Sequence, residues 1–596
     1  MHHFKKIFHL LILCFILFSC SKKADILQPE NQSNTTNDIQ TQVRIASRSG
    51  NPMSLKNIRF AAGKLAGKND LEAERYTYNI PLNQQMIYFK FNPNEAHKSI
   101  ASMEQDTSLI LLNTPFADVD IYRNAENLTE QDYQRLKDGM IYGMLPIDRI
   151  ATLGNINIQK LDTLYNPESD EDPIMMESLV RTGFVSREEA NQRIFCRNPL
   201  SGRIRHEDTE FGANNLQPVR GMKVIAFFLG LPRVAHTDMN GFYATRWRFL
   251  VGAFVFTKAA NSRAIIKPIN SANGWAADIG NIITNFVIGS VTAHGWSPCR
   301  WMRNFNINYT GHDQRNLWCH MLNSVAMHHA YMRNDNLEGL TPNRLVMYAH
   351  WSEETGSGSA PMLSKLVTND DAILAGTFAL AFGTGSPIIP AFYLLYVKTA
   401  PDITIRESAD INRRRTSSEL MQVMFHELGH AAHFSNVGGT YWLAYITQIV
   451  SNTVSGNDCG TYGCGNEILA GVIQVGESWA EFIGTDHALR YHANGQKISR
   501  FFGGNWVRFD RALEEEPWFD QRFIGTGVFH DFRDGFNVNE PNDNVEGVTI
   551  RQMYNALTSD ATNLCRYLDQ LILQNNLDFN LLNLIFIQNL QDPCNI

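Results

Sequence analysis

The sequence predicts a multidomain α+β protein: an N-terminal α/β region, a β-rich middle segment, and a mainly helical C-terminal domain with a mixed sheet. Three observations predict this class. The chain has 596 residues, 44% of them hydrophobic and 19% charged, which is enough apolar material for roughly two to four cores. Strand and helix patterns alternate between residues 86 and 112, and short β-rich runs continue to about residue 258. From Thr416 onward, apolar residues recur at helical spacing.

The first residues have the organisation of an export signal, so they are left out of the fold. Lys5 and Lys6 give a basic start, and residues 10–18 form an apolar stretch. Nine apolar residues are too few to span a bilayer.

The sequence Leu17-Phe-Ser-Cys20 resembles the lipobox of bacterial lipoproteins. The resemblance implies removal of residues 1–19, a lipid on Cys20, and a flexible tether over residues 20–43. Phe18 departs from the small residue usual at its position, and an ordinary signal peptide cut nearby would also export the chain. In both cases we expect the protein to be exported. With the lipid on Cys20, which is the reading that we adopt, it would be held to a membrane of the bacterial cell envelope.

Export favours disulfide formation. Cys14 leaves with the signal and Cys20 would carry lipid, so seven of the nine cysteines remain and one must be unpaired. None has the spacing of a zinc ribbon. Proximity in the sequence favours three pairs: Cys459 with Cys464, Cys299 with Cys319, and Cys565 with Cys594.

Residues 44–200 form a separate predicted region, a small α+β domain. Residues 86–91 are predicted as a strand, 95–104 as a helix and 108–112 as another strand, which together suggest a β-α-β unit. No catalytic constellation occurs there.

Residues 201–270 are rich in short β runs, with the turn signal Asn240-Gly241 between two of them. The pattern resembles carboxypeptidase regulatory-like domains, which are small transthyretin-like β-sandwiches of exported bacterial proteins. This resemblance implies a small β-sandwich without a catalytic role. Asp238 and Asn240 are suited to a calcium loop, but no Glu follows at the required offset, so we expect them to form a turn.

The third region comprises residues 271–596. Residues 287–335, with His312, His320, His328 and His329, are predicted to be helical, as are residues 545–596. His328 and His329 are adjacent and so diverge on a helix, which argues against a second metal site. The uncharged run 372–397 contains Gly383, Pro387 and Pro390 and is therefore predicted as helix, loop and strand instead of a membrane span. We expect its last part, residues 392–398, to be the strand that pairs with an extended substrate.

The main functional signal is the sequence His426-Glu-Leu-Gly-His430, which lies within a predicted helix from Thr416 to Phe434. Thr416-Ser-Ser-Glu419 is a capping box, and residues 436–439 supply a helix stop. On a helix, His426 and His430 lie on one face, so both imidazoles can bind one metal ion while Glu427 points beside them at a water molecule.

A catalytic zinc ion needs a third protein ligand. The motif resembles that of zincin metallopeptidases. The metzincin pattern fails because His433 and Asn436 stand where it requires other residues. Gly476-Glu-Ser-Trp-Ala-Glu-Phe482 is similar to the stretch that carries the third ligand in gluzincins. The resemblance implies a zincin-like metallopeptidase domain in which His426, His430 and Glu477 bind Zn²⁺. Glu481, one turn later, would hydrogen-bond a ligand histidine.

Several alternatives remain at this stage. The 46 residues between His430 and Glu477 exceed the usual gap, and Glu467 is a rival ligand. Glu481 can also be a solvated helix charge, and the two motif histidines can be ordinary buried ones. We expect His433 to bond the last carbonyls of its helix. The resemblance requires an oxyanion-stabilising Tyr or His, and the candidates are His487, Tyr491, His530 and Tyr554.

The sequence therefore predicts a monomeric, lipid-anchored zinc metallopeptidase that cleaves a peptide or protein substrate with Glu427 as the general base. The alternative is a non-catalytic envelope protein that binds peptide or glycan on a degenerate zincin scaffold. A nucleic-acid partner is not expected. Without residues 1–19 the chain has 50 basic and 60 acidic side chains, a net charge of −10, and Arg413-Arg-Arg415 is too short to be a basic stripe.

Overall fold

The structure is a computed structural model. The residues that it describes are 50–116, 136–192, 196, 198–249, 252–270, 279–337, 344–353, 356–366, 401–455, 459–492, 499–502, 505–508, 524–525, 527–533, 547–578 and 582. The predicted export signal, the tether and the run 372–397 lie outside these ranges. The fold is mixed α+β with several separate sheets, as expected.

The first sheet has the order β2-β3-β1-β4. Its strands are β1 (Gln85–Phe91), β2 (Ile110–Leu112), β3 (Ile141–Pro146) and β4 (Gln159–Tyr165), and the helices of this region are α3 (Leu55–Leu65), α4 (Asp70–Glu74), α5 (Ile100–Gln105), α8 (Pro173–Arg181) and α9 (Arg187–Gln192). Both predicted strands are confirmed. They do not form a simple β-α-β unit, however, because β1 and β2 each pair antiparallel with β3, which lies between them.

Two further sheets follow in the middle of the chain. One has the order β12-β10-β7-β8, formed by β7 (Lys223–Phe228), β8 (Leu231–His236), β10 (Gly252–Lys258) and β12 (Val291–Pro298). The other contains β5 (Ser201–Glu207), β6 (Leu216–Pro218), β9 (Phe242–Ala244) and β13 (Ile307–Tyr309). Strands β12 and β13 lie beyond residue 270, so these sheets run across the boundary expected there. Asp238 accepts hydrogen bonds from the amides of Asn240 and Phe242, which is the turn chemistry that we expected.

The fourth sheet has the order β11-β14-β16-β15. Strands β11 (Ala264–Asn270), β14 (Leu345–Ser352) and β16 (Ile403–Ser408) run parallel, and every residue of β14 and β16 is buried. Strands of a parallel sheet that is covered on both faces are buried along their whole length in this way. The short strand β15 (Ser357–Ser359) pairs antiparallel with β16 and is the last strand on that side within the described ranges. The sheet is therefore mixed, as expected.

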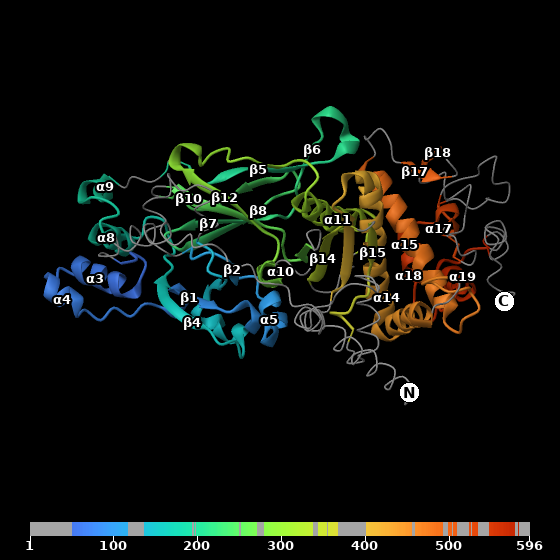
Figure 1. Cartoon of the computed structure of the whole chain (residues 1–596), viewed down its shortest axis with the longest axis horizontal. Coiled ribbons are helices and arrows are strands. Elements are labelled where there is room, and N and C mark those ends of the chain that lie inside the picture. Colours follow the sequence, from blue (N-terminus) through green and yellow to red (C-terminus); the bar gives the residue numbers. More distant parts are fainter. Residues whose placement is uncertain are drawn as a thin grey trace, which may run out of the picture. The chain divides into compact units, whose positions relative to one another are not determined.

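Helices form most of the described structure outside these four sheets. Those not named above are α10 (Ile279–Ile288), α11 (Gln314–Asn334), α14 (Ser417–Ser455), α15 (Ala470–Tyr491), α17 (Val528–Asp531), α18 (Ile550–Ala556) and α19 (Leu564–Asn575). Figure 1 shows α14 and α15 together beside the sheet that contains β14 and β15, with α17, α18 and α19 next to them. The helical prediction for residues 287–335 is correct only for α11, because β12 and β13 precede it. None of the described helices is both long and apolar enough to cross a bilayer.

The cysteine pairing was predicted only in part. Cys459 bonds Cys464, as expected, and Cys565 is also disulfide-bonded. The predicted pair Cys299–Cys319 is wrong. Cys299 bonds Cys196, which is 103 residues earlier in the sequence, and Cys319 is a buried free thiol on α11. Proximity in the sequence failed here because the fold brings the loop before β5 against the turn after β12.

Candidate metal centre

Helix α14 begins with the predicted capping box. The amide of Glu419 donates to Thr416 Oγ1 at 3.2 Å, and the amide of Thr416 donates to Glu419 Oε2 at 2.8 Å. These bonds satisfy amides that have no partner inside a helix. Met421, Met424 and Leu428 lie fully buried along one side of the first turns. The start of the motif helix is therefore confirmed.

The predicted stop of this helix is confirmed, but a second helical segment that was not predicted follows it. Gly438 adopts φ 81° and ψ 175°, which breaks the helical path near the expected stop, but helical structure resumes and continues to Ser455. The positive φ suits glycine because it has no Cβ. After the break, the rings of Trp442 and Tyr445 lie 5.7 and 5.6 Å from the ring of His430. The second part of α14 thus forms an aromatic wall against a motif histidine.

Glycines allow α14 and α15 to pack at short range. A Cβ on Gly429 would lie 3.1 Å from Ala480 Cα, and a Cβ on Gly484 would lie 3.0 Å from His426 Cβ. The indole of Trp479 donates to the carbonyl of Gly429 at 3.2 Å. Because the helix axes approach so closely, a short side chain on α15 can reach the histidines on α14.

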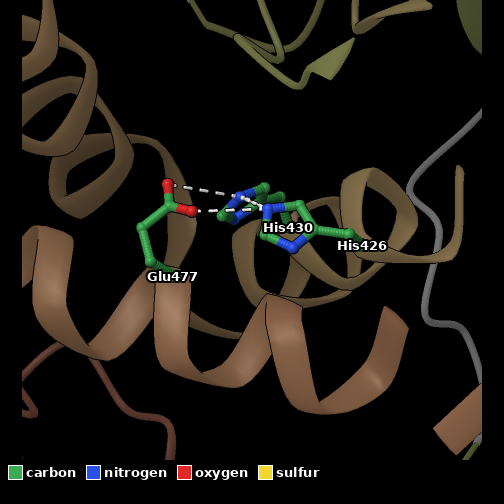
Figure 2. Close-up of side chains that lie close together, drawn as sticks. All are labelled: His426, His430 and Glu477. Atoms are coloured by element: carbon green, nitrogen blue, oxygen red, sulfur yellow. Dashed lines mark hydrogen bonds and ion pairs between the residues drawn. The ribbon is translucent and has the colours of Figure 1, made fainter. Parts of the chain in front are cut away.

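Three side chains meet at this contact, and we call them the triad: His426, His430 and Glu477 (Figure 2). Glu477 Oε2 is 3.3 Å from His426 Nε2, and Glu477 Oε1 is 3.5 Å from His430 Nε2. The two Nε2 atoms are 3.1 Å apart. Within the described ranges, no other group of His, Cys, Asp and Glu has its ligand atoms gathered in this way. The triad can hold a metal ion.

The two histidines are oriented by different contacts. His426 Nδ1 lies 3.1 Å from Glu481 Oε2, and the other oxygen of Glu481 accepts a hydrogen bond from Gln422. A carboxylate at this place fixes the tautomer that leaves Nε2 free for a metal ion. The buried Nδ1 atom of His430 has no hydrogen-bond partner, so the aromatic wall holds that ring by packing. Glu481 is therefore not a solvated charge.

The triad is electrostatically coupled. Burial alone would raise the pKa of Glu477, but His430 and His426 lower it below its usual value. Burial by itself lowers the pKa of His426, yet hydrogen bonds to Glu477 and Glu481 raise it well above its usual value. For His430 burial prevails, and its pKa is lowered. A neutral His430 and an ionised Glu477 are the forms that bind a cation.

Glu427 lies beside the triad, and only 5% of its surface is exposed. Burial raises its pKa to about 8. No hydrogen bond connects its carboxylate with another side chain or backbone group in the described part of the chain. A buried, unpaired carboxylate costs stability, which makes a functional role a natural explanation.

The edge strand β15 covers Glu427. A Cβ on Gly358 would lie 2.4 Å from Glu427 Oε1 and 2.8 Å from Val423 Cγ1, so only glycine fits at this position. This contact could not be predicted from the sequence, because residues 357–359 form a very short strand without a β pattern.

We expect Gly358→Ala to displace the Glu427 carboxylate and to lower any turnover about tenfold, because small displacements of a catalytic group cost about this much or more. Metal binding should be unchanged, since the three atoms nearest to the new methyl group belong to Glu427 and Val423 and not to the triad. Gly439→Ala is the matched control, because a Cβ there would meet only Leu366 Cδ2 at 3.8 Å. Equal activities of the two variants in a steady-state assay would show that this contact does not position Glu427.

Other candidate residues lie elsewhere. Glu467 accepts hydrogen bonds from the amides of Cys464 and Gly465 and so closes the disulfide loop. The prediction for His433 is wrong: the helix continues, and both nitrogens of this buried ring are without a hydrogen-bond partner.

The expected oxyanion candidates have different surroundings. The ring of His487 lies against that of His328. Tyr491 accepts a hydrogen bond from Asn323, and Tyr554 donates to the carbonyl of Ala432. His530 lies in α17.

Two tyrosines approach the triad instead. The hydroxyl of Tyr445 donates to Glu477 Oε1. The charge of Glu477 and burial together raise the pKa of Tyr462 well above its usual value. Both tyrosines lie in the long connection between the two motif segments. The unusual length of that connection was visible in the sequence, but nothing in it indicated which of its residues return to the site.

Comparisons with known proteins found no match among protein-family models, curated proteins or solved structures.

Proposed function

We propose that the protein is a zinc metallopeptidase of the gluzincin type, with His426, His430 and Glu477 as metal ligands and Glu427 as the general base. The observation that carries the proposal is the convergence of two imidazole nitrogens and a carboxylate next to the buried Glu427, whose carboxylate has no hydrogen bond to another described residue. In an ion pair that serves only structure, each buried charge has a partner of opposite charge. A hydrolytic site instead needs a carboxylate that is free to accept and return a proton.

The donor set fits zinc. Zinc in proteins binds nitrogen and oxygen at about 2.0–2.2 Å in a tetrahedron, so two of its ligand atoms are about 3.3 Å apart. In the triad the two Nε2 atoms are 3.1 Å apart, one oxygen of Glu477 is 3.3 Å from His426 and its other oxygen is 3.5 Å from His430. With one ligand atom taken from each residue, all three lie within 4.8 Å of one another, so a small inward shift of the side chains would close them around the ion. Three protein ligands leave the fourth position for water or substrate, which is the pattern of catalytic sites.

The chain's residues have separate roles in this mechanism. Bound zinc would polarise the substrate carbonyl and lower the pKa of a coordinated water. Glu427 takes a proton from the attacking water and passes it to the leaving amine. Glu481 holds His426 through Nδ1, and Tyr445 holds Glu477 through Oε1, so both act as positioning residues.

A peptide substrate is supported by the place of β15. Its outer edge has no neighbouring strand within the described part of the sheet, and its central residue lies next to Glu427. An extended peptide that adds to this edge would run past the triad. The export signal, the lipid on Cys20 and the monomeric state belong to the same proposal.

The test combines metal analysis with digestion of a peptide library. We expect one zinc ion per chain, together with cleavage that stops on treatment with a chelator and returns when zinc is added. Bound zinc without cleavage of any peptide would reject the enzyme and favour the non-catalytic binder. Protein without stoichiometric metal would reject the whole proposal.

A further inference from the structure

A second polar site lies in a hollow between the first sheet and the strands β10 and β11. Its cavity volume is about 30 Å³. Its charged residues are four cations and two acids: Lys223, Lys258, Lys267, Arg344, Glu104 and Asp106. Segments far apart in the sequence supply them, and none belongs to the triad.

The charges in this hollow do not balance. Lys267 pairs with Glu104 at 2.7 Å, and both side chains are almost fully buried. Lys223 donates to the carbonyl of Thr107, and Arg344 donates to the carbonyl of Glu104. Carbonyl oxygens satisfy donors but carry no net charge. Asp106 attracts Lys223 and Glu104 attracts Arg344, but neither cation forms a direct ion pair with a described carboxylate.

Asp106 supplies only part of the missing charge. Its carboxylate accepts hydrogen bonds from Ser108 and Thr152, which keep it ionised, and it attracts Lys223. Glu104 pairs with Lys267, so two acids face four cations in the hollow.

The register of the sheet increases the repulsion. Lys223 and Lys258 are direct partners across the antiparallel strands β7 and β10, and like charges in this arrangement destabilise a sheet. The ammonium group of Lys258 has no hydrogen-bond or ion-pair partner among the described residues. Burial and the charges of Lys267 and Lys223 hold the pKa of Lys258 well below its usual value.

We propose that this hollow binds a small oxyanion of the phosphate type, coordinated by Lys258 together with Lys223 and Arg344. One multiply charged anion between these cations would replace their repulsion by attraction, and its oxygens would accept charge-assisted hydrogen bonds. The site is independent of the proposed peptidase activity, because it shares no residue with the triad, Glu427 or β15.

The experiment is calorimetric titration of the purified chain with inorganic phosphate, at an ionic strength kept constant with chloride. We expect saturable binding of one phosphate per chain. Lys258→Met keeps the length of the side chain and removes its charge, so it should weaken binding by about tenfold or more. Lys68→Met is the matched control, because Lys68 is exposed and far in sequence from the hollow, and it should leave the affinity unchanged.

Thermal unfolding supplies a second readout and a check on folding. Phosphate should raise the Tm of the wild type and of Lys68→Met, but not that of Lys258→Met. Without phosphate, Lys258→Met should be at least as stable as the wild type, because it removes a repelling charge. The proposal is overturned by absence of saturable phosphate binding, by equal affinity of the two variants, or by strong destabilisation in Lys258→Met, which would assign Lys258 a structural role.

Discussion

Replacement of Glu427 by Gln is expected to lower peptide hydrolysis by about 10²–10⁴-fold, the usual contribution of a general base. Gln has the same shape but cannot accept and return a proton. The triad should keep its metal ion, because Glu427 is not one of the three converging donors. Steady-state kinetics and elemental analysis of the same preparation measure the two effects separately.

The control for this variant is Glu467→Gln. Glu467 is an acid on the same connection as the site but accepts hydrogen bonds from amides of the disulfide loop and is not one of the three converging donors, so its replacement should leave both turnover and metal content intact. Normal turnover in Glu427→Gln would refute the role of the base. Loss of metal in that variant would instead make Glu427 a ligand.

The second large effect is expected in the zinc affinity of three variants, in each of which one glutamate is replaced by glutamine. Glu477→Gln should weaken zinc binding by more than about 100-fold, because losing only an outer partner of a ligand already costs about 10–100-fold. Glu481→Gln should fall within that smaller range, since it contacts the metal site only through His426 Nδ1. Glu467→Gln should have no effect.

Competition titration with a chromophoric chelator gives these affinities, and circular dichroism verifies that each variant is folded. If Glu467→Gln and not Glu477→Gln lost the metal, the assigned ligand would be wrong. If all three variants bound zinc equally, the triad would be an ordinary buried hydrogen-bond cluster. Both results are distinguishable from misfolding, because misfolding would also alter the helical spectrum.

Predictions based on neighbouring residues succeeded in this chain. The capping box at Thr416 depends on residues three apart, and the common face of His426 and His430 depends on helical periodicity. Strands β1 and β2 follow from runs of apolar residues, and the small disulfide loop needs only five residues of chain. Each of these features is determined within about two helical turns or one strand.

Several predictions that depended on distant residues failed or could not be made, although Glu477 and Glu481 do lie beside the motif histidines as the resemblance implied. The order of the first sheet places β3 between two strands that precede it in the sequence. The partner of Cys299 lies 103 residues away. The helix stop at Gly438 was predicted, but the helical segment after it, which burial of Trp442 and Tyr445 stabilises, was not.

The sequence by itself determined which side chains could bind a metal ion: two histidines one turn apart, an acid between them, and two more acids one turn apart on a later helix. Only the tertiary structure decided which acid reaches the histidines, because that depends on the close approach of α14 and α15 at Gly429 and Gly484. It also decided that β15 covers Glu427 and that Lys223 and Lys258 line the same hollow. Local sequence sets backbone geometry and charge, whereas distances between elements are set by packing, in which every residue of the interface takes part.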